Sequence, residues 1–97
     1  MDRAESLREN LERIMGPVAH SDLAAHIARD AVFIVSGAVS LIDCAVAIAM
    51  DDVDRVKPWI DSGALRKPTQ SERDAWPAGV WNSVVVQPFV LVQRAPD

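Results

Sequence analysis

The side chains of this sequence that most readily do chemistry are two histidines, one cysteine and a run of aspartates. His20 and His26 are six residues apart, so in one helix they would point to different sides, whereas paired metal ligands on a helix are usually four residues apart. A closed zinc site also needs about four ligands. We therefore predict no metal site, and we expect His26, which lies beside Leu23 and Ile27, to be a partly buried structural residue.

The cysteine, Cys44, could act as a nucleophile only if its thiol were partly exposed and close to positive charge. It lies instead among Ile42, Ala45 and Val46, where we expect it to pack in the core as a small hydrophobic side chain. A single cysteine cannot form an internal disulfide, which fits a reducing compartment. The sequence predicts a buried, unreactive thiol.

Asp51, Asp52 and Asp54 form the acidic run and could in principle bind a divalent cation. The run lacks the glycine and the distal glutamate of an EF-hand loop, and the helix dipole already explains carboxylates at the start of a helix. The motifs of phosphate loops, cysteine-pair zinc sites and serine hydrolases are also absent. The sequence therefore predicts no catalytic residue, no metal ligand and no cofactor.

The tryptophans and the valine-rich C-terminal segment could instead bind another protein, because tryptophan is enriched at interface hot spots. With only two phenylalanines and no tyrosine in the chain, the three indole rings are expected to be the largest pieces of the core. Trp81, which opens the final strand beside Gly79, is the one that we expect to be exposed. The predicted interaction surface comprises Trp81, Val84, Val86, Phe89 and Val90.

The composition is that of one folded domain, residues 1–97, with tails at 1–5 and 94–97 that are expected to fray. Hydrophobic residues make up 49% of the chain and charged residues 25%, a balance far from that of disordered proteins. Much of the apolar content is alanine and valine, which bury little area each, so the core is expected to be thin unless a second chain covers part of it. We therefore expect a homodimer or a protein partner.

The charge pattern argues against two other classes of partner. The formal net charge is −4 and the ten basic residues are scattered, so there is no positive stripe for a nucleic acid or an anionic membrane. The charged start of the chain does not resemble a signal peptide, and no apolar run is long enough to span a bilayer. We expect no nucleic acid, no membrane and a cytoplasmic location.

The elements that would position these side chains are short helices and strands. Apolar spacing predicts helices near 6–15, 21–30, 51–63 and 69–77 and strands near 31–35, 64–67 and 83–93. Residues 40–50 alternate as a strand would, but their alanines and the Ser40–Asp43 spacing favour a helix. The predicted fold class is α+β, a small sheet of about three strands with four or five short helices packed mainly on one face.

Two prolines complicate these predicted elements. Pro58 removes a backbone donor inside 51–63, so we expect a kink or two short turns in place of one regular helix. Pro88 cannot donate to a strand ladder and therefore marks a bulge, a break between two strands or a strand edge. The segment around Pro88 is apolar on both faces, so it needs cover on both sides.

Three segments of the sequence are distinctive together: Ser40-Leu-Ile-Asp-Cys-Ala, the Asp51-Asp52 pair leading to Val56, Trp59 and Ser62-Gly63, and the run from Trp81 through Val84-Val-Val-Gln-Pro-Phe-Val-Leu-Val-Gln93. They resemble a bacterial family of uncharacterised proteins, domain of unknown function 2288, and the C-terminal run with its Gln-Pro core is the most specific part. The resemblance covers about residues 7–93 and departs from the family pattern at His20, where an aromatic residue often precedes the second helix, and at Phe89, where tryptophan commonly follows the proline. It implies a small single-domain bacterial protein and supplies no activity, cofactor or catalytic residue.

These observations favour a non-enzymatic accessory or protein-interaction module. The missing chemical motifs, the valine-rich final strand and the thin core all point to it. The alternative is a small enzyme or a metabolite- or metal-binding domain in which acidic side chains and a histidine converge on a pocket. The weak candidates for that pocket are His26, Asp43, Asp51, Asp52 and Asp54.

Overall fold

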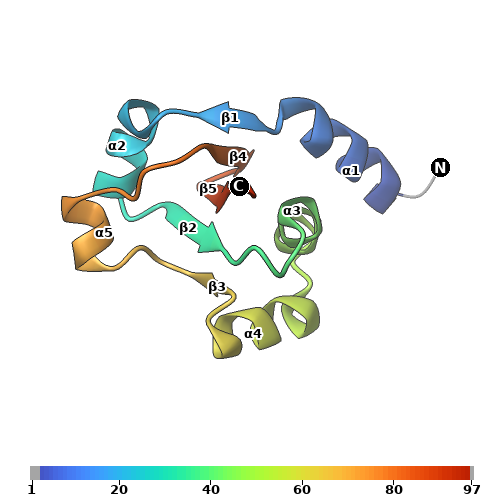
Figure 1. The fold of residues 1–97 in the computed structure, drawn as a ribbon. Helices are drawn as coiled ribbons and strands as arrows, with labels where there is room; N and C mark the ends of the chain where they lie inside the picture. The colour runs from blue at the N-terminus through green and yellow to red at the C-terminus, as the bar shows by residue number, and fades with distance from the viewer. Residues whose placement is uncertain (1–2, 97) are drawn as a thin grey trace.

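The computed structural model of the chain describes residues 3–96, which form five helices and five strands (Figure 1). No helix in this part of the chain is long and apolar enough to cross a membrane. The helices are α1 (Arg3–Ile14), α2 (His20–Ala28), α3 (Leu41–Ala49), α4 (Val53–Ser62) and α5 (Gln70–Asp74). The strands are β1 (Gly16–Val18), β2 (Val32–Val35), β3 (Leu65–Arg66), β4 (Trp81–Val86) and β5 (Phe89–Arg94).

All five strands belong to one mixed sheet in the order β1-β4-β5-β2-β3. β4 and β5 form a central antiparallel hairpin, β2 runs parallel to β5, and β1 and β3 pair antiparallel at the two edges. The α+β class is confirmed, but the predicted count of about three strands is wrong. The segment 83–93 divides at the cis Gln87–Pro88 turn, so a break between two strands is the correct reading of Pro88. β1 was missed because glycine and proline are depleted in strands.

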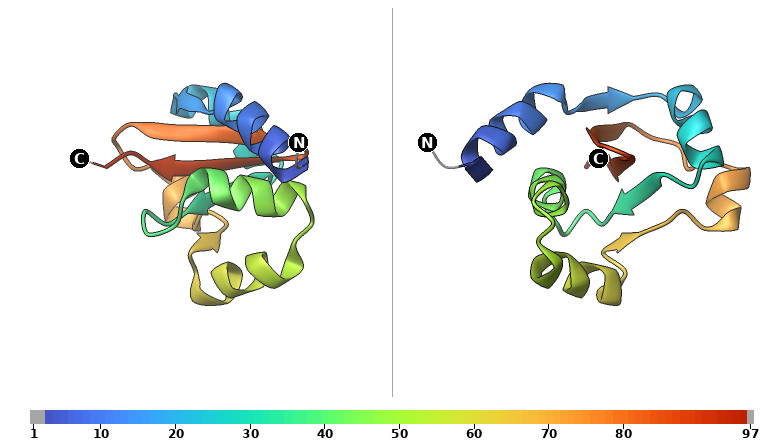
Figure 2. Two further views of the ribbon diagram at one scale, coloured as in Figure 1. Left: turned by 90° about the vertical axis from the view of Figure 1, so that its right-hand side faces the viewer. Right: turned by 180° about the vertical axis from the view of Figure 1, so that it is seen from behind.

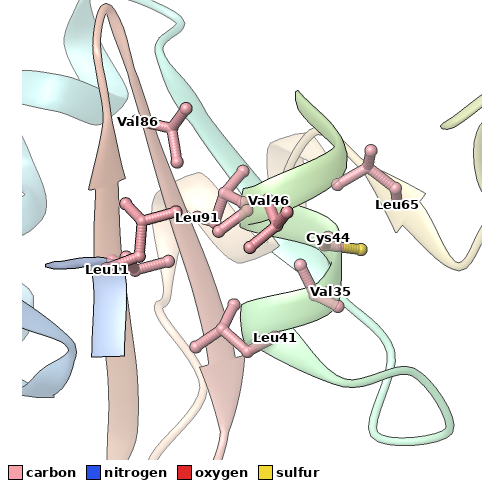
Figure 3. Packing of buried hydrophobic residues seen from close by; sticks show 10 residues of the cluster. Leu11, Val35, Leu41, Cys44, Val46, Leu65, Val86 and Leu91 are labelled. Atoms are coloured by element: carbon pink, nitrogen blue, oxygen red, sulfur yellow. The ribbon is translucent and has the colours of Figure 1, made fainter. Parts of the chain in front are cut away.

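The sheet is covered on both faces, so the prediction that the helices pack mainly on one face is wrong. Figure 1, in which β4 and β5 are seen nearly end-on, shows α1 and α3 on one side of this pair and α2 and α5 on the other. Because successive strand residues face opposite ways, Leu91 packs with α1 and α3, whereas Val90 and Val92 pack with α2. Figure 3 shows the Leu91 and Val46 side chains meeting between β5 and α3.

The ambiguous segment 40–50 is a helix, as its alanines indicated. The hydroxyl of Ser40 caps α3 by accepting a hydrogen bond from the Asp43 backbone N–H, at 3.3 Å. Asp52 caps the next helix in the same way, and Gly63 ends it in the left-handed conformation, at φ 81°. This helix, α4, is one element that runs through Pro58, so the expectation of two short turns is wrong. Pro58 is exposed, and water can serve the backbone carbonyl that the proline leaves without a donor.

The loop and helix that follow β3 are fixed by charged side chains. Thr69 and Glu72 form a capping box at the start of α5, and Arg66 donates two hydrogen bonds to the Glu72 carboxylate, at 2.7 and 3.0 Å. Arg66 and the Thr69 backbone lower the pKa of Glu72 to about 2. Asp30, before β2, accepts from Lys67 and from Arg73, so these pairs join α5 and the β3 edge to the body of the sheet.

The expected tails are partly in regular structure. Residues 3–5 lie in α1 and Arg94 is the last residue of β5. Residues 1, 2 and 97 lie outside the described residues.

Candidate functional site

The acidic and histidine side chains that were candidates for a shared pocket lie in three different places. Asp43, on α3, accepts a hydrogen bond from Arg8 of α1 at 2.6 Å. His26, on α2, is half-buried on the opposite face of the sheet and contacts the Arg29 guanidinium. Asp51 and Asp52, at the turn between α3 and α4, line a common hollow. Among residues 3–96, no three His, Cys, Asp or Glu side chains are grouped so as to hold a metal ion.

Cys44 is a core residue, as expected, and lies on the face of the sheet that α3 covers. It is completely buried, and burial, reinforced by the neighbouring Asp43 charge, raises its pKa to about 11. Because the thiolate is the reactive form, the native thiol should not act as a nucleophile at neutral pH.

We expect Cys44 in the folded protein to resist alkylation by iodoacetamide from pH 7 to pH 9. The reaction should proceed at the rate of a free thiol only in denaturant, because both burial and the raised pKa are lost on unfolding. Mass spectrometry of the alkylated chain measures this directly. Rapid modification of the native chain, rising with pH through 8.5, would contradict the core position of Cys44.

The predicted interaction surface on the final strands is mostly interior. Trp81, Val84, Val86 and Val90 are all buried, and Phe89 is half-buried. The indole of Trp81 donates a hydrogen bond to the Pro77 carbonyl, at 3.0 Å. The expectation that Trp81 is an exposed anchor is therefore wrong, and of the five predicted residues Phe89 has the greatest access to a partner.

Helix α4 carries an open apolar surface. This helix has no buried residue and packs on the outer side of α3, away from the β4–β5 hairpin (Figure 2). Val53 is 63% exposed and Ile60 is 55% exposed. Between α3 and α4 is a hollow of about 340 Å³ whose lining is largely apolar. Its lining residues are Ala47, Ile48, Asp51, Asp52, Val53, Val56, Lys57 and Ile60.

A second hollow of about 230 Å³ adjoins the first and shares Ile48, Val56 and Ile60 with it. It continues to Leu65 and Phe89, and the ring of Phe89 meets that of Phe33 edge to face, with centroids 5.3 Å apart. Together the two hollows form one apolar surface from the α3–α4 turn to the start of β5. We call Ile48, Val53, Val56, Ile60 and Phe89 the α4 surface.

The rim of the α4 surface is acidic. The segment 51–62 carries four aspartates and two basic side chains, Arg55 and Lys57. None of these aspartates takes part in a salt bridge within residues 3–96, whereas Asp30, Asp43 and Glu72 all do. Arg55 lies over the Trp59 ring, 5.6 Å from its centroid. The α4 surface therefore combines exposed apolar side chains with a border of net negative charge.

The apolar spacing in 51–63 predicts an inward helical face, but α4 has no buried residue in the structure. Val53, Val56 and Ile60 follow helical spacing, which indicates that they share one face of the helix. Spacing does not reveal how deeply that face is covered. Two features of the sequence did indicate that this helix is exposed. The other positions in 51–62 are highly charged, and the helix contains Pro58; both are more common in helices at the surface of a domain.

Three comparisons place the chain among known proteins. The sequence model of the family described as "Protein of unknown function (DUF2288)" matches residues 6–94. The fold is similar to the NMR solution structure of PA1075 from Pseudomonas aeruginosa, with a TM-score of 0.81 and 25% sequence identity over 100% of this chain and 92% of that one. No curated protein matches the sequence.

Proposed function

We propose that this chain, which belongs to the DUF2288 family as its C-terminal segment indicated, is a non-enzymatic protein-interaction module that binds a partner through the α4 surface. The family description states no activity, so the proposal is argued from the surface of the chain itself. One observation carries the proposal. Helix α4 exposes Val53 and Ile60 beside two adjoining apolar hollows, with no buried residue of its own.

The energetic reason is that covering these side chains would be favourable. Burying a valine or isoleucine completely contributes about 1.5–3 kcal/mol, and these two side chains retain more than half of their exposure. Interfaces draw most of their energy from a few residues that are seated in pockets and shielded from water. A partner that covers Val53 and Ile60 and fills the hollow between them could therefore bind specifically through a small surface.

A second candidate function is the binding of a small molecule. The hollow between α3 and α4, at about 340 Å³, is within the size range of ligand pockets, about 300–1,000 Å³. Asp51, Asp52 and Lys57 supply polar groups at its edge. A ligand-dependent rise in unfolding temperature that Asp51→Asn removes would favour this candidate over a protein partner.

The cytoplasm is the compartment that we propose for the module. Its one cysteine is a free, buried thiol, which suits a reducing environment. A bacterial origin is supported by the structural relative from Pseudomonas aeruginosa.

Two matched aspartate substitutions test the protein-interaction proposal. Val53 and Val80 are the same residue type with nearly equal exposure, 63% and 62%, but Val80 lies in the loop before β4, outside the α4 surface. Both variants should fold, because surface substitutions usually change stability by less than about 0.5 kcal/mol. Asp at position 53 is also favourable in the first turn of a helix.

The tagged full-length chain and both variants would be purified from cells of the source organism, and the accompanying proteins quantified by mass spectrometry. We expect a defined protein to be lost with Val53→Asp and retained with Val80→Asp. If every accompanying protein is retained equally by the two variants, the α4 surface is not the interaction surface.

A further inference from the structure

We propose that the occupant of the α4 surface is an amphipathic helix of another protein whose apolar stripe is flanked by lysine and arginine. This inference rests on the proposed function and adds the chemistry of the partner to it. Shape and charge support it separately.

The shape of the α4 surface fits a helix. Val53, Val56 and Ile60 are three and four residues apart along α4, so they extend over about 10 Å, or two helical turns. A helix that binds in a groove presents apolar anchors at the same spacing, i, i+3 or i+4, and i+7. Such anchors could enter the two adjoining hollows, which share Ile48, Val56 and Ile60.

A strand is a poorer occupant, because strand addition requires a free backbone edge. The α4 surface consists mostly of side chains on two helices. The nearest sheet edge is β3, which has two residues. An edge of this length offers too few backbone groups to hold a strand.

The charge of the rim selects a basic partner. Asp51, Asp52 and one cation, Lys57, line the first hollow. Asp54 and Asp61 are exposed on α4, so the carboxylates outnumber the basic side chains here. None of these carboxylates has a salt-bridge partner within residues 3–96. A lysine or arginine beside an apolar stripe would meet these carboxylates, and complementary charge speeds association and rejects partners of the same sign.

The same charges argue against a second copy of this chain, the homodimer expected from the sequence. If two α4 helices paired in parallel, the aspartates at 51–54 of one copy would face those of the other. If they paired antiparallel, these aspartates would approach Asp61. Each copy carries a formal net charge of −4, and its segment 51–62 has four aspartates against Arg55 and Lys57. Both arrangements therefore bring two surfaces of net negative charge together.

Designed peptides test this proposal on the full-length protein. One helical peptide carries leucines at the i, i+3, i+7 spacing with lysines on both flanks. A second has the same leucines with glutamates, and a third has the lysines with serines in place of the leucines. Affinity for the wild type, Val53→Asp and Val80→Asp would be measured by fluorescence anisotropy at low and at physiological ionic strength.

We expect the leucine–lysine peptide to bind at least about tenfold more tightly than either of the others, and to weaken as salt is raised. Val53→Asp should weaken its binding at least about tenfold, whereas Val80→Asp should leave it unchanged. Val53→Asp separates the contribution of charge to binding from that of apolar contact. It adds a negative charge, so binding by charge alone would strengthen, while binding through the apolar surface is lost.

Other results would overturn the inference, and they differ in what they say of the proposed function. Equal binding of the lysine and glutamate peptides, lost in Val53→Asp, would retain the interaction surface but reject a basic partner. A dimer that Val53→Asp dissociates would identify a second copy as the occupant. No peptide binding, while Val53→Asp still loses an accompanying cellular protein, would reject only the helical basic partner. If no accompanying protein is lost either, the proposed function fails as well.

Discussion

Replacing Trp81 with alanine is expected to lower the free energy of unfolding by about 3–5 kcal/mol, the range for removing a large buried aromatic side chain. Trp81 is only 6% exposed, and its ring packs against that of Trp76 with centroids 5.0 Å apart. The substitution also removes the hydrogen bond from the indole to the Pro77 carbonyl. Urea denaturation followed by circular dichroism measures the change.

Phe89→Ala provides the comparison, because Phe89 lies in the same hairpin but is half-buried at the edge of the α4 surface. Phe89→Ala should lower the free energy of unfolding by less than Trp81→Ala, by about 1–2 kcal/mol. The effect of Trp81→Phe on the free energy of unfolding should lie between those of Trp81→Ala and Phe89→Ala, because it keeps an aromatic ring but loses the hydrogen bond. If Trp81→Ala were as mild as a surface substitution, Trp81 would be an exposed anchor after all and the two-sided sheet would be wrong.

The Gln93 side chain is expected to be the polar group whose loss is most damaging. Its amide Nε2 donates to the carbonyls of Ser36 and Val39, at 2.8 and 2.6 Å, and so ties the end of β5 to the loop that leads into α3. Gln93→Leu should cost about 1–3 kcal/mol, because two carbonyls in a partly buried site lose their donor.

Gln93→Glu should cost more than Gln93→Leu at pH 7, roughly 3 kcal/mol or more, because a carboxylate cannot donate and would face two carbonyl oxygens. Amide hydrogen exchange should locate the damage. Protection of Val39, whose N–H donates to the Ser36 carbonyl, and of the first turn of α3 should fall before that of β4. Uniform loss of protection across the sheet, or a Glu variant as stable as the wild type, would contradict this role.

The parts of the fold that the sequence predicted are those in which local signals agree. Ser40, with Asp43 three residues on, marks the start of α3, and the apolar run before Ser36 is β2. β1 gave no such signal, because Gly16-Pro17-Val18 becomes a strand only by pairing with residues 81–83 of β4. The two faces of the sheet were hidden for a similar reason. The continuous apolar run of β5 shows that both sides need cover, but it does not identify which helices supply that cover.

The candidate site was less predictable than the fold. Residue types identified the apolar face of α4 and the aspartates beside it, but not that the face stays open, because exposure depends on where α3 and β3 place the helix. Trp81 and Val90 show the opposite error. Their residue types are compatible with an exposed interface, but in the structure they are buried beneath α2 and the loop after α5. Phe89 is the predicted surface residue that the structure places beside α4.

Site-specific photocrosslinking is the most direct test of the claim that the α4 surface is where this protein binds its partner. A photoreactive phenylalanine would replace Ile60 in one full-length chain and Ile14 in another, two isoleucines of similar exposure, 55% and 60%, on different surfaces. After irradiation in cells of the source organism, we expect a discrete crosslinked protein at position 60. It should be absent at position 14 and lost when Val53→Asp is added. No product at position 60, or the same product at both positions, would contradict it.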